Sequence, residues 1–122
     1  MGRTTNGLIK SRVATTAIPA YRFVKEGPAD GTAVLAVDGT AAIIGVSSEL
    51  DTAVGERVSV QQGGNVAEIT YGGNVARGDF LTADAQGRAV STTTTGARYG
   101  GIAEVSGVLG DIGTCTIALG IL

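Results

Sequence analysis

Two pairs of carboxylates are candidates for a catalytic acid–base couple in this sequence: Glu49 with Asp51, and Asp79 with Asp84. General acid–base catalysis most often uses histidine, because its pKa lies near neutral pH. The sequence contains no histidine, which removes serine triads and cysteine–histidine dyads in their ordinary form. Each acid pair also lies at a predicted turn, where carboxylates accept hydrogen bonds from backbone amides. We therefore expect these acids to cap turns and the protein to have no catalytic activity.

The other motifs with chemical potential are weak. Cys115 is the one cysteine of the chain, so it can form neither an internal disulfide nor a metal-binding cluster, and we expect an inert strand residue. The glycine pairs Gly72-Gly73 and Gly100-Gly101 differ from phosphate loops, because no lysine–serine pair or helix start follows them. Arg77-Gly78-Asp79 spells the integrin tripeptide, but a sharp backbone corner explains the same three residues. The sequence therefore predicts no cofactor and no metal.

Charge is distributed unevenly along the chain. Residues 1–25 contain five basic residues and no acid, whereas the rest contains four basic and eleven acidic residues. A basic segment attached to an acidic body indicates either a solvated tail or an arm that reaches an acidic partner. The basic residues of this segment are Arg3, Lys10, Arg12, Arg22 and Lys25.

Several other partners fit the sequence poorly. Three basic charges between Arg3 and Arg12, with no aromatic residue among them, make a thin footprint for nucleic acid beside a body that repels phosphate. No apolar run reaches the roughly 18 residues of a membrane span. The first ten residues lack the apolar core of a secretion signal. We therefore expect no nucleic-acid partner, no membrane partner and no secretion.

The composition predicts that short strands position the acidic, basic and cysteine residues named above. The chain has 122 residues, of which 43% are hydrophobic, 4% are aromatic and twenty are glycine. This composition indicates one domain whose core consists of small side chains suited to strands. A short helical turn fits best at residues 50–54, and residues 91–96 form a polar loop or an edge strand. The predicted strands cover residues 22–25, 32–37, 40–47, 57–62, 66–71, 99–105 and 114–122.

Residues 71–90 predict a compact β corner around which the chain is organised, with glycines and aspartates where the backbone reverses. Its buried-type residues are Val75, Phe80, Leu81 and Val90. A weaker copy of this corner lies earlier in the chain. Ile18–Val24 aligns with Val75–Leu81 at an offset of 57, and Val54–Val60 aligns with Leu109–Cys115 at an offset of 55. The sequence therefore predicts a strand-rich half that is used twice.

Five segments carry a resemblance to a known family: AIPAYRFVK, IIGVS, VGERVSV, GNVARGDFLTADAQGRAV and GGIAEV. Together they resemble phage head decoration proteins, also called capsid cement proteins, over roughly residues 17–119. The resemblance implies an all-β fold, namely a small bent-ribbon or β-clip-like (β-tulip) barrel. It also implies an extended N-terminal arm and at most one short helical turn. Proteins of this kind bind the outside of an assembled icosahedral shell, often as trimers at local three-fold positions, and reinforce it.

The resemblance and the charge pattern together divide the chain into an arm, residues 1–16, and a β-rich decoration domain, residues 17–122. The expected function is structural: binding to the outer surface of the assembled phage head, with the major capsid protein as partner. The expected location is the virion, after synthesis in the host cytoplasm. The candidate capsid-contact residues are Arg3, Leu8, Ile9, Lys10 and Arg12.

Two further expectations follow. The terminal run 114–122 and the threonine-rich edge 91–95 suggest strand edges that need a partner, which favours a homotrimer. The alternative function is a small-molecule- or carbohydrate-binding β-clip accessory domain, because similar ribbons are attached to sugar-acid enzymes. That alternative is less favoured, since the sequence predicts no second domain and its five aromatic residues are scattered, with both phenylalanines expected in the core.

Overall fold

The fold is built from β-strands throughout the described part of the chain. The computed structural model describes residues 8–122, and within that range it contains ten strands and no helix. The all-β prediction is confirmed, and the predicted strand at residues 57–62 coincides with β5. In chain order the strands are β1 (Leu8–Ala14), β2 (Phe23–Glu26), β3 (Thr32–Leu35), β4 (Ile43–Ser47), β5 (Arg57–Gln62), β6 (Val66–Thr70), β7 (Phe80–Ala83), β8 (Ala89–Ser91), β9 (Arg98–Ala103) and β10 (Ile112–Ile121).

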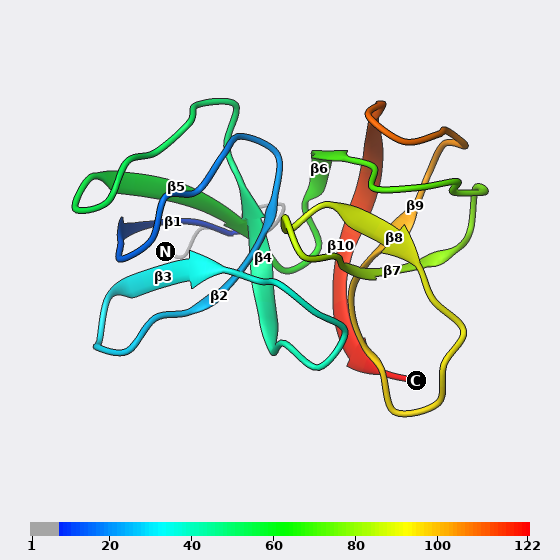
Figure 1. Cartoon of the computed structure of the whole chain (residues 1–122), viewed down its shortest axis with the longest axis horizontal. Coiled ribbons are helices and arrows are strands. Elements are labelled where there is room, and N and C mark those ends of the chain that lie inside the picture. Colours follow the sequence, from blue (N-terminus) through cyan, green and yellow to red (C-terminus); the bar gives the residue numbers. More distant parts are fainter. Residues whose placement is uncertain (1–7) are drawn as a thin grey trace, which may run out of the picture.

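The strands form two lobes that lie side by side (Figure 1). The first lobe is a closed barrel with the strand order β1-β3-β2-β4-β5. The second lobe is a five-stranded sheet with the order β6-β10-β9-β7-β8. A parallel bridge between Tyr71 and Ala89 links the two outer strands of this sheet. The barrel expected from the sequence is thus the first lobe. The second lobe is a curved sheet whose two outer strands approach each other at this bridge.

The strand pairing confirms the internal repeat. The pairs β1–β5, β2–β3, β2–β4 and β4–β5 of the first lobe correspond to β6–β10, β7–β8, β7–β9 and β9–β10 of the second. An isolated bridge between Ile18 and Thr52 likewise corresponds to one between Val75 and Gly107. These bridges differ by the predicted offsets of 57 and 55. The two lobes are therefore two copies of one strand plan.

The repeat also accounts for the one described non-glycine residue with a positive φ. Tyr21 has a φ of 59°, and its counterpart in the second lobe is Gly78, with a φ of 93°. Both amides make equivalent hydrogen bonds: Tyr21 N–H donates to Ser48 O, and Gly78 N–H donates to Ala103 O. This position requires a left-handed backbone, which glycine adopts at lower cost than tyrosine.

The buried side chains form two clusters. One fills the barrel of the first lobe and consists of Ala14, Ile18, Val24, Ala33, Val58 and Val60. The larger one fills the second lobe and extends across the boundary to the first lobe. Its members from the first lobe are Phe23, Ala36, Ala41, Ile43 and Val46. One continuous core therefore holds the two lobes together.

A glycine permits the close approach of the two lobes. A Cβ atom at Gly100 would lie 2.7 Å from Ile43 Cγ2 and 2.8 Å from Phe23 Cε1, both in the other lobe. Backbone hydrogen bonds also cross the boundary, since Phe23 N–H donates to Gly87 O and Thr70 N–H donates to Tyr21 O. We therefore expect the lobes to behave as one rigid body.

Two expectations about local structure are wrong. Phe80 does not lie in the core, because it is 37% exposed at the start of β7, and only the three residues that follow it in the strand are buried. Residues 50–54 form no helical turn, because Thr52 pairs with Ile18 across the loop. In both cases a contact with a distant segment determines the local structure.

Candidate functional site

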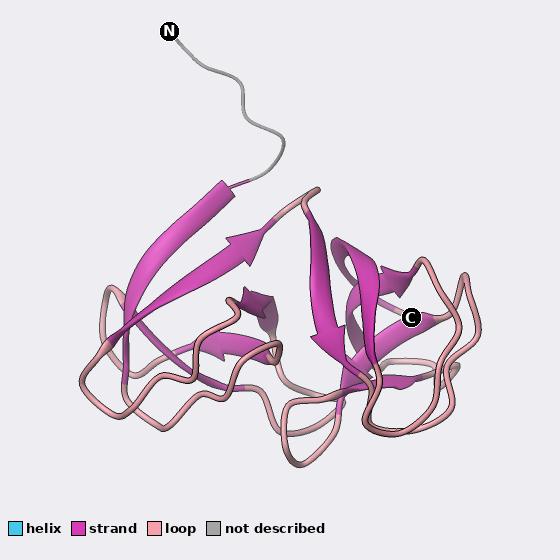
Figure 2. Cartoon of the chain, turned by 90° about the horizontal axis from the view of Figure 1, so that it is seen from above, coloured by secondary structure: helices cyan, strands magenta, loops and turns pink. Residues whose placement is uncertain are grey.

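The predicted contact segment begins in the wall of the barrel. β1 pairs antiparallel with β5 from Leu8 to Val13, but it pairs with β3 only at Val13 and Ala14. From Leu8 to Arg12, one backbone edge of β1 therefore has no partner strand among residues 8–122. Figure 2 shows this strand at the rim of its lobe. An open strand edge can pair with a strand of another chain.

The predicted contact residues divide into three groups. Ile9 and Lys10 lie on β1 with their side chains exposed, and Ile9 is 66% exposed. Leu8 is the first residue of the same strand. Arg3 lies outside the described residues. The structure thus places Leu8, Ile9 and Lys10 together on an accessible strand, and it differs from the expectation of one loosely held arm over residues 1–16.

Arg12 is largely engaged within the protein. Its guanidinium forms an ion pair with Glu26, and Arg12 Nη1 also donates a hydrogen bond to Thr32 O at 3.3 Å. The Arg12 side chain is only 15% exposed, and its Nε is buried without a hydrogen-bond partner. Arg22 is similarly tied to the other lobe, where its Nη1 donates to Gln86 O at 2.8 Å. Of the basic residues on β1, Lys10 is therefore the more accessible cation.

Replacing Arg12 with alanine is expected to lower the free energy of unfolding by about 1 to 2 kcal/mol, through lost packing of its stem and lost hydrogen bonds. The matched control is Lys10→Ala on the same strand, which should change stability by less than about 0.5 kcal/mol because that side chain is exposed. Urea unfolding followed by circular dichroism measures both values. Equal stabilities of the two variants would show that the Arg12 contacts contribute nothing to folding.

A second open edge lies at the end of β10. This strand pairs with β6 over Ile112–Thr116, and with β9 as far as Ile121. The pairing with β9 shifts between Ile117 and Gly120. Leu119, within this irregularity, and Ile121, beyond it, are both exposed. Within the described residues no strand pairs with the other edge of this terminal part. The terminal run predicted from the sequence is therefore paired on one side and open on the other.

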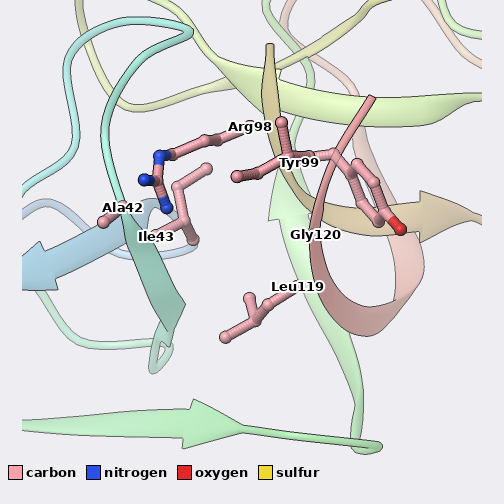
Figure 3. A pocket seen from close by; sticks show the side chains of 7 residues that line it. Ala42, Ile43, Arg98, Tyr99, Leu119 and Gly120 are labelled. Carbon is pink, nitrogen blue, oxygen red and sulfur yellow. The ribbon is translucent and has the colours of Figure 1, made fainter. Parts of the chain in front are cut away.

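A groove of about 290 Å³ accompanies this edge, between the starts of β4 and β9 and the end of β10 (Figure 3). The side chain of Arg98 extends across the groove toward Ile43 of the other lobe, whereas the Tyr99 ring lies over Gly120. Among residues 8–122 the Arg98 side chain has no ion-pair partner. The groove thus combines exposed aliphatic side chains with an available cation. Its lining residues are Ala42, Ile43, Arg98, Tyr99, Leu119, Gly120 and Ile121.

Of the two acid pairs considered for catalysis, Asp79 and Asp84 cap turns, whereas Asp51 Oδ1 accepts a hydrogen bond from the distant Ala20 N–H at 2.9 Å. Asp79 Oδ2 accepts a hydrogen bond from Ala76 N–H at 2.9 Å, within the corner that contains Gly78. Asp84 accepts hydrogen bonds from the backbone amides of Gln86 and Arg88, and it forms an ion pair with the Arg88 side chain. These contacts confirm the interpretation of Asp79 and Asp84 as turn residues.

Cys115 lies in β10 with its side chain fully buried. Burial, with a smaller contribution from Glu104, raises the pKa of its thiol to about 12. A thiol in this state has almost no thiolate at neutral pH, and the thiolate is the reactive form. The interpretation of Cys115 as an inert strand residue agrees with this environment.

The raised pKa predicts a pH-dependent stability. The unfolded chain loses the Cys115 proton near the ordinary pKa of 9.0, whereas the folded chain holds it to about 12. The unfolded state therefore binds fewer protons between these values, and this contribution to the free energy of unfolding falls as the pH rises from 9 to 12. Comparison with Cys115→Ala isolates the effect, since the variant lacks the titrating group. Parallel curves for the two proteins above pH 9 would contradict the assignment.

Two other classes of site are absent from the described chain. Residues 8–122 contain no group of three or more histidine, cysteine, aspartate or glutamate residues arranged to hold a metal ion. Nor does that part of the chain contain a helix long and apolar enough to cross a membrane.

The sequence interpretation missed the two loops that follow β4 and β9. Residues 49–56 and 104–111 carry exposed aliphatic side chains at corresponding positions, including Leu50, Val54 and Leu109. The internal repeat at an offset of 55 residues could have revealed these loops, because it aligns Val54 with Leu109. What the sequence did not show is that both side chains face solvent.

Together, the fold and its surfaces define a class: a small duplicated β protein with open strand edges and exposed aliphatic loops, suited to attachment. Residues 4–111 match the family model described as phage cement protein, so the chain belongs to the phage cement protein family. Its role is structural decoration of the phage capsid. The resemblance to capsid cement proteins is thereby confirmed. A comparison with curated proteins gave no match.

The fold is similar to that in "The crystal structure of head fiber gp8.5 N base in bacteriophage phi29". The TM-score is 0.71 at 20% sequence identity, and the similarity covers 91% of this chain and 93% of that one. A similarity at this level of identity shows that the two chains share the two-lobed fold.

Proposed function

We propose that this protein binds the outer surface of the assembled phage head, with the major capsid protein as its partner. The observation that carries the proposal is the open edge of β1, which presents the exposed Ile9 and Lys10 directly after the N-terminal residues. Backbone pairing along such an edge supplies affinity, and the exposed side chains supply specificity. The protein is made in the host cytoplasm, resides in the virion and catalyses no reaction.

Decoration stabilises a shell by mass action. A protein that binds only the assembled, expanded lattice stabilises it by about 2.7 kcal/mol per site when its free concentration is a hundredfold above the dissociation constant. Repeated over the shell, these contributions resist rupture.

The test of the proposed function mixes the purified protein with undecorated expanded heads and with unexpanded precursor shells. Density at regular lattice positions on expanded heads, and DNA release at higher temperature, support the proposal. Absence of binding to any shell contradicts it.

We propose further that the protein acts as a homotrimer that uses the open edge of β10. Leu119 and Ile121 are exposed beside that edge, and association would remove both from water. Three attached copies raise the effective concentration of each contact, so that the avidity exceeds a single affinity by roughly a hundredfold or more.

Sedimentation of the isolated protein is expected to give three times the chain mass of 12.1 kDa. Ile121→Asp should shift the equilibrium toward the monomer, because it places a charge in the proposed apolar contact. The matched control is Val66→Asp, at an exposed aliphatic residue on β6. A trimer that tolerates Ile121→Asp, or a wild-type monomer at micromolar concentration, would contradict this use of β10.

One observation favours the alternative function, binding of a small neutral ligand. A pocket of about 380 Å³ is lined by five threonines, two glycines and one alanine. One of them, Thr82, is 6% exposed, and its hydroxyl has no hydrogen-bond partner among the described residues. A neutral polyhydroxylated molecule such as a sugar would pair with such hydroxyls. Thermal stabilisation by sugars that Thr82→Val abolishes, together with no binding to shells, would favour this function over decoration.

A further inference from the structure

The loops after β4 and β9, residues 49–56 and 104–111, are equivalent parts of the two lobes. At an offset of 55, Leu50 corresponds to Val105 and Val54 to Leu109, and all four side chains are exposed, Leu50 to 68% and Leu109 to 60%. A single exposed aliphatic residue needs no explanation. Exposure of aliphatic residues at the same positions in both copies indicates a surface that each lobe uses in the same way.

Both loops are held in a fixed shape by equivalent contacts. Gly55 N–H donates to Ala14 O, and its counterpart Gly110 N–H donates to Tyr71 O. A carboxylate closes each loop as well. Glu56 Oε1 accepts a hydrogen bond from Ala53 N–H at 3.0 Å, and Asp111 Oδ2 accepts one from Val108 N–H at 2.9 Å. Loops that are ordered before binding lose little conformational entropy when a partner covers them.

The loops also share a charge pattern. Residues 49–56 contain three acids and residues 104–111 contain two, and neither loop contains a basic residue. Glu49 and Glu104 occupy corresponding positions immediately before the aliphatic residues Leu50 and Val105. An apolar tip within an acidic rim complements an apolar pocket with a basic rim, because opposite potentials steer and orient the encounter.

From these observations we infer that the two loops bind equivalent apolar, basic-rimmed pockets on two neighbouring copies of one shell subunit. The inference rests on the proposed function. An assembled shell presents the same subunit surface repeatedly, and this chain presents the same loop twice. In Figure 1 the loops lead out of the upper ends of β4 and β9, one on each lobe. A chain that engages two adjacent subunits links them across their boundary.

The first test measures binding of the full chain to undecorated expanded heads. Leu50→Ser and Leu109→Ser should each weaken binding at least tenfold, since truncation of a buried apolar contact commonly costs that much. The double variant should weaken binding at least a hundredfold. The matched control is Val37→Ser, at an aliphatic residue that is 43% exposed but has no aliphatic counterpart in the second lobe. Its binding should equal that of wild type, and all variants should unfold at the wild-type denaturant concentration.

The outcomes separate this inference from the proposed function. If wild type binds heads and the double variant binds equally well, the loops are not the contact, and decoration itself stands. If only one single variant weakens binding, the equivalence of the loops is wrong. If wild type binds no shell, the proposed function is wrong, and the inference about the loops falls with it. Electron microscopy of decorated heads provides the direct check: both loops should contact the same residues on two adjacent subunits, and a loop that faces solvent overturns the inference.

Discussion

Gly45→Ala is expected to lower the free energy of unfolding by at least about 3 kcal/mol. Gly45 lies in β4 where β5 crosses closely, and a Cβ atom there would lie 2.1 Å from Gln61 O and 2.9 Å from Val60 Cγ1. The nearer atom belongs to the backbone of a paired strand, so no side-chain rotation can relieve the clash. Relief requires β4 and β5 to separate, which opens the barrel of the first lobe.

Two matched glycines make this prediction specific. Gly63 has no atom within 4 Å of the position of an added Cβ, and its φ is not positive, so Gly63→Ala should be nearly neutral. Gly101 is the counterpart of Gly45 in the second lobe, where the nearest atoms would lie at 3.0 and 3.1 Å. Gly101→Ala should therefore give an intermediate loss. Equilibrium unfolding in urea orders the three variants, and a Gly45→Ala protein as stable as Gly63→Ala would refute the argument.

Features that depend on local patterns could be predicted from the sequence. The alternation of Val58 and Val60 predicts a half-buried strand, and β5 has those bounds with both valines buried. The duplicated plan was also accessible, because Ile18–Val24 and Val75–Leu81 keep similar residues at similar turn positions. Strand alternation and turn chemistry act over a few residues, so they leave a signal that can be read along the chain.

Features that depend on distant contacts could not be predicted in this way. Phe80 was expected in the core because it is aromatic, but only the packing of the second sheet decides where along β7 burial begins. Arg12 was assigned to a free arm, because nothing near it in sequence indicates its ion pair with Glu26, fourteen residues away. The close packing of the lobes at Gly100 could not be predicted from the sequence either, since it depends on Phe23 and Ile43 in the other lobe.

The contact surface could likewise be predicted only in part from the sequence. The sequence directed attention to Ile9 and Lys10, and the structure makes both accessible on an open edge. Nothing in the sequence separates the residues before Leu8 from the strand that follows them. That separation matters for any truncation, because β1 supplies one wall of the barrel and pairs with β5 at six positions.

Removal of residues 2–14 is accordingly expected to abolish cooperative folding of the first lobe. The deletion removes all of β1 and the fully buried Ala14, and it leaves β3 and β5 without their shared neighbour. Val58 and Val60 would then be exposed to water at one side of the barrel. This expectation follows from the position of β1 in the barrel wall, within the segment 1–16 that was predicted to be an arm. Circular dichroism and urea unfolding should show a broad, early transition, and a sharp transition at the wild-type midpoint would contradict a structural role for β1.

Removal of residues 2–7 is the matched experiment, because it leaves every described strand in place. This variant should unfold at the wild-type urea concentration, yet bind expanded heads about tenfold more weakly if Arg3 and its neighbours contact the shell. The wild-type advantage should shrink as salt is added, since salt screens exposed charges beyond roughly 10 Å at 0.1 M. Lys10→Ala in the truncated chain should weaken binding further. If the truncated protein binds as tightly as wild type at every salt concentration, the contact begins at β1 and the residues before it contribute nothing.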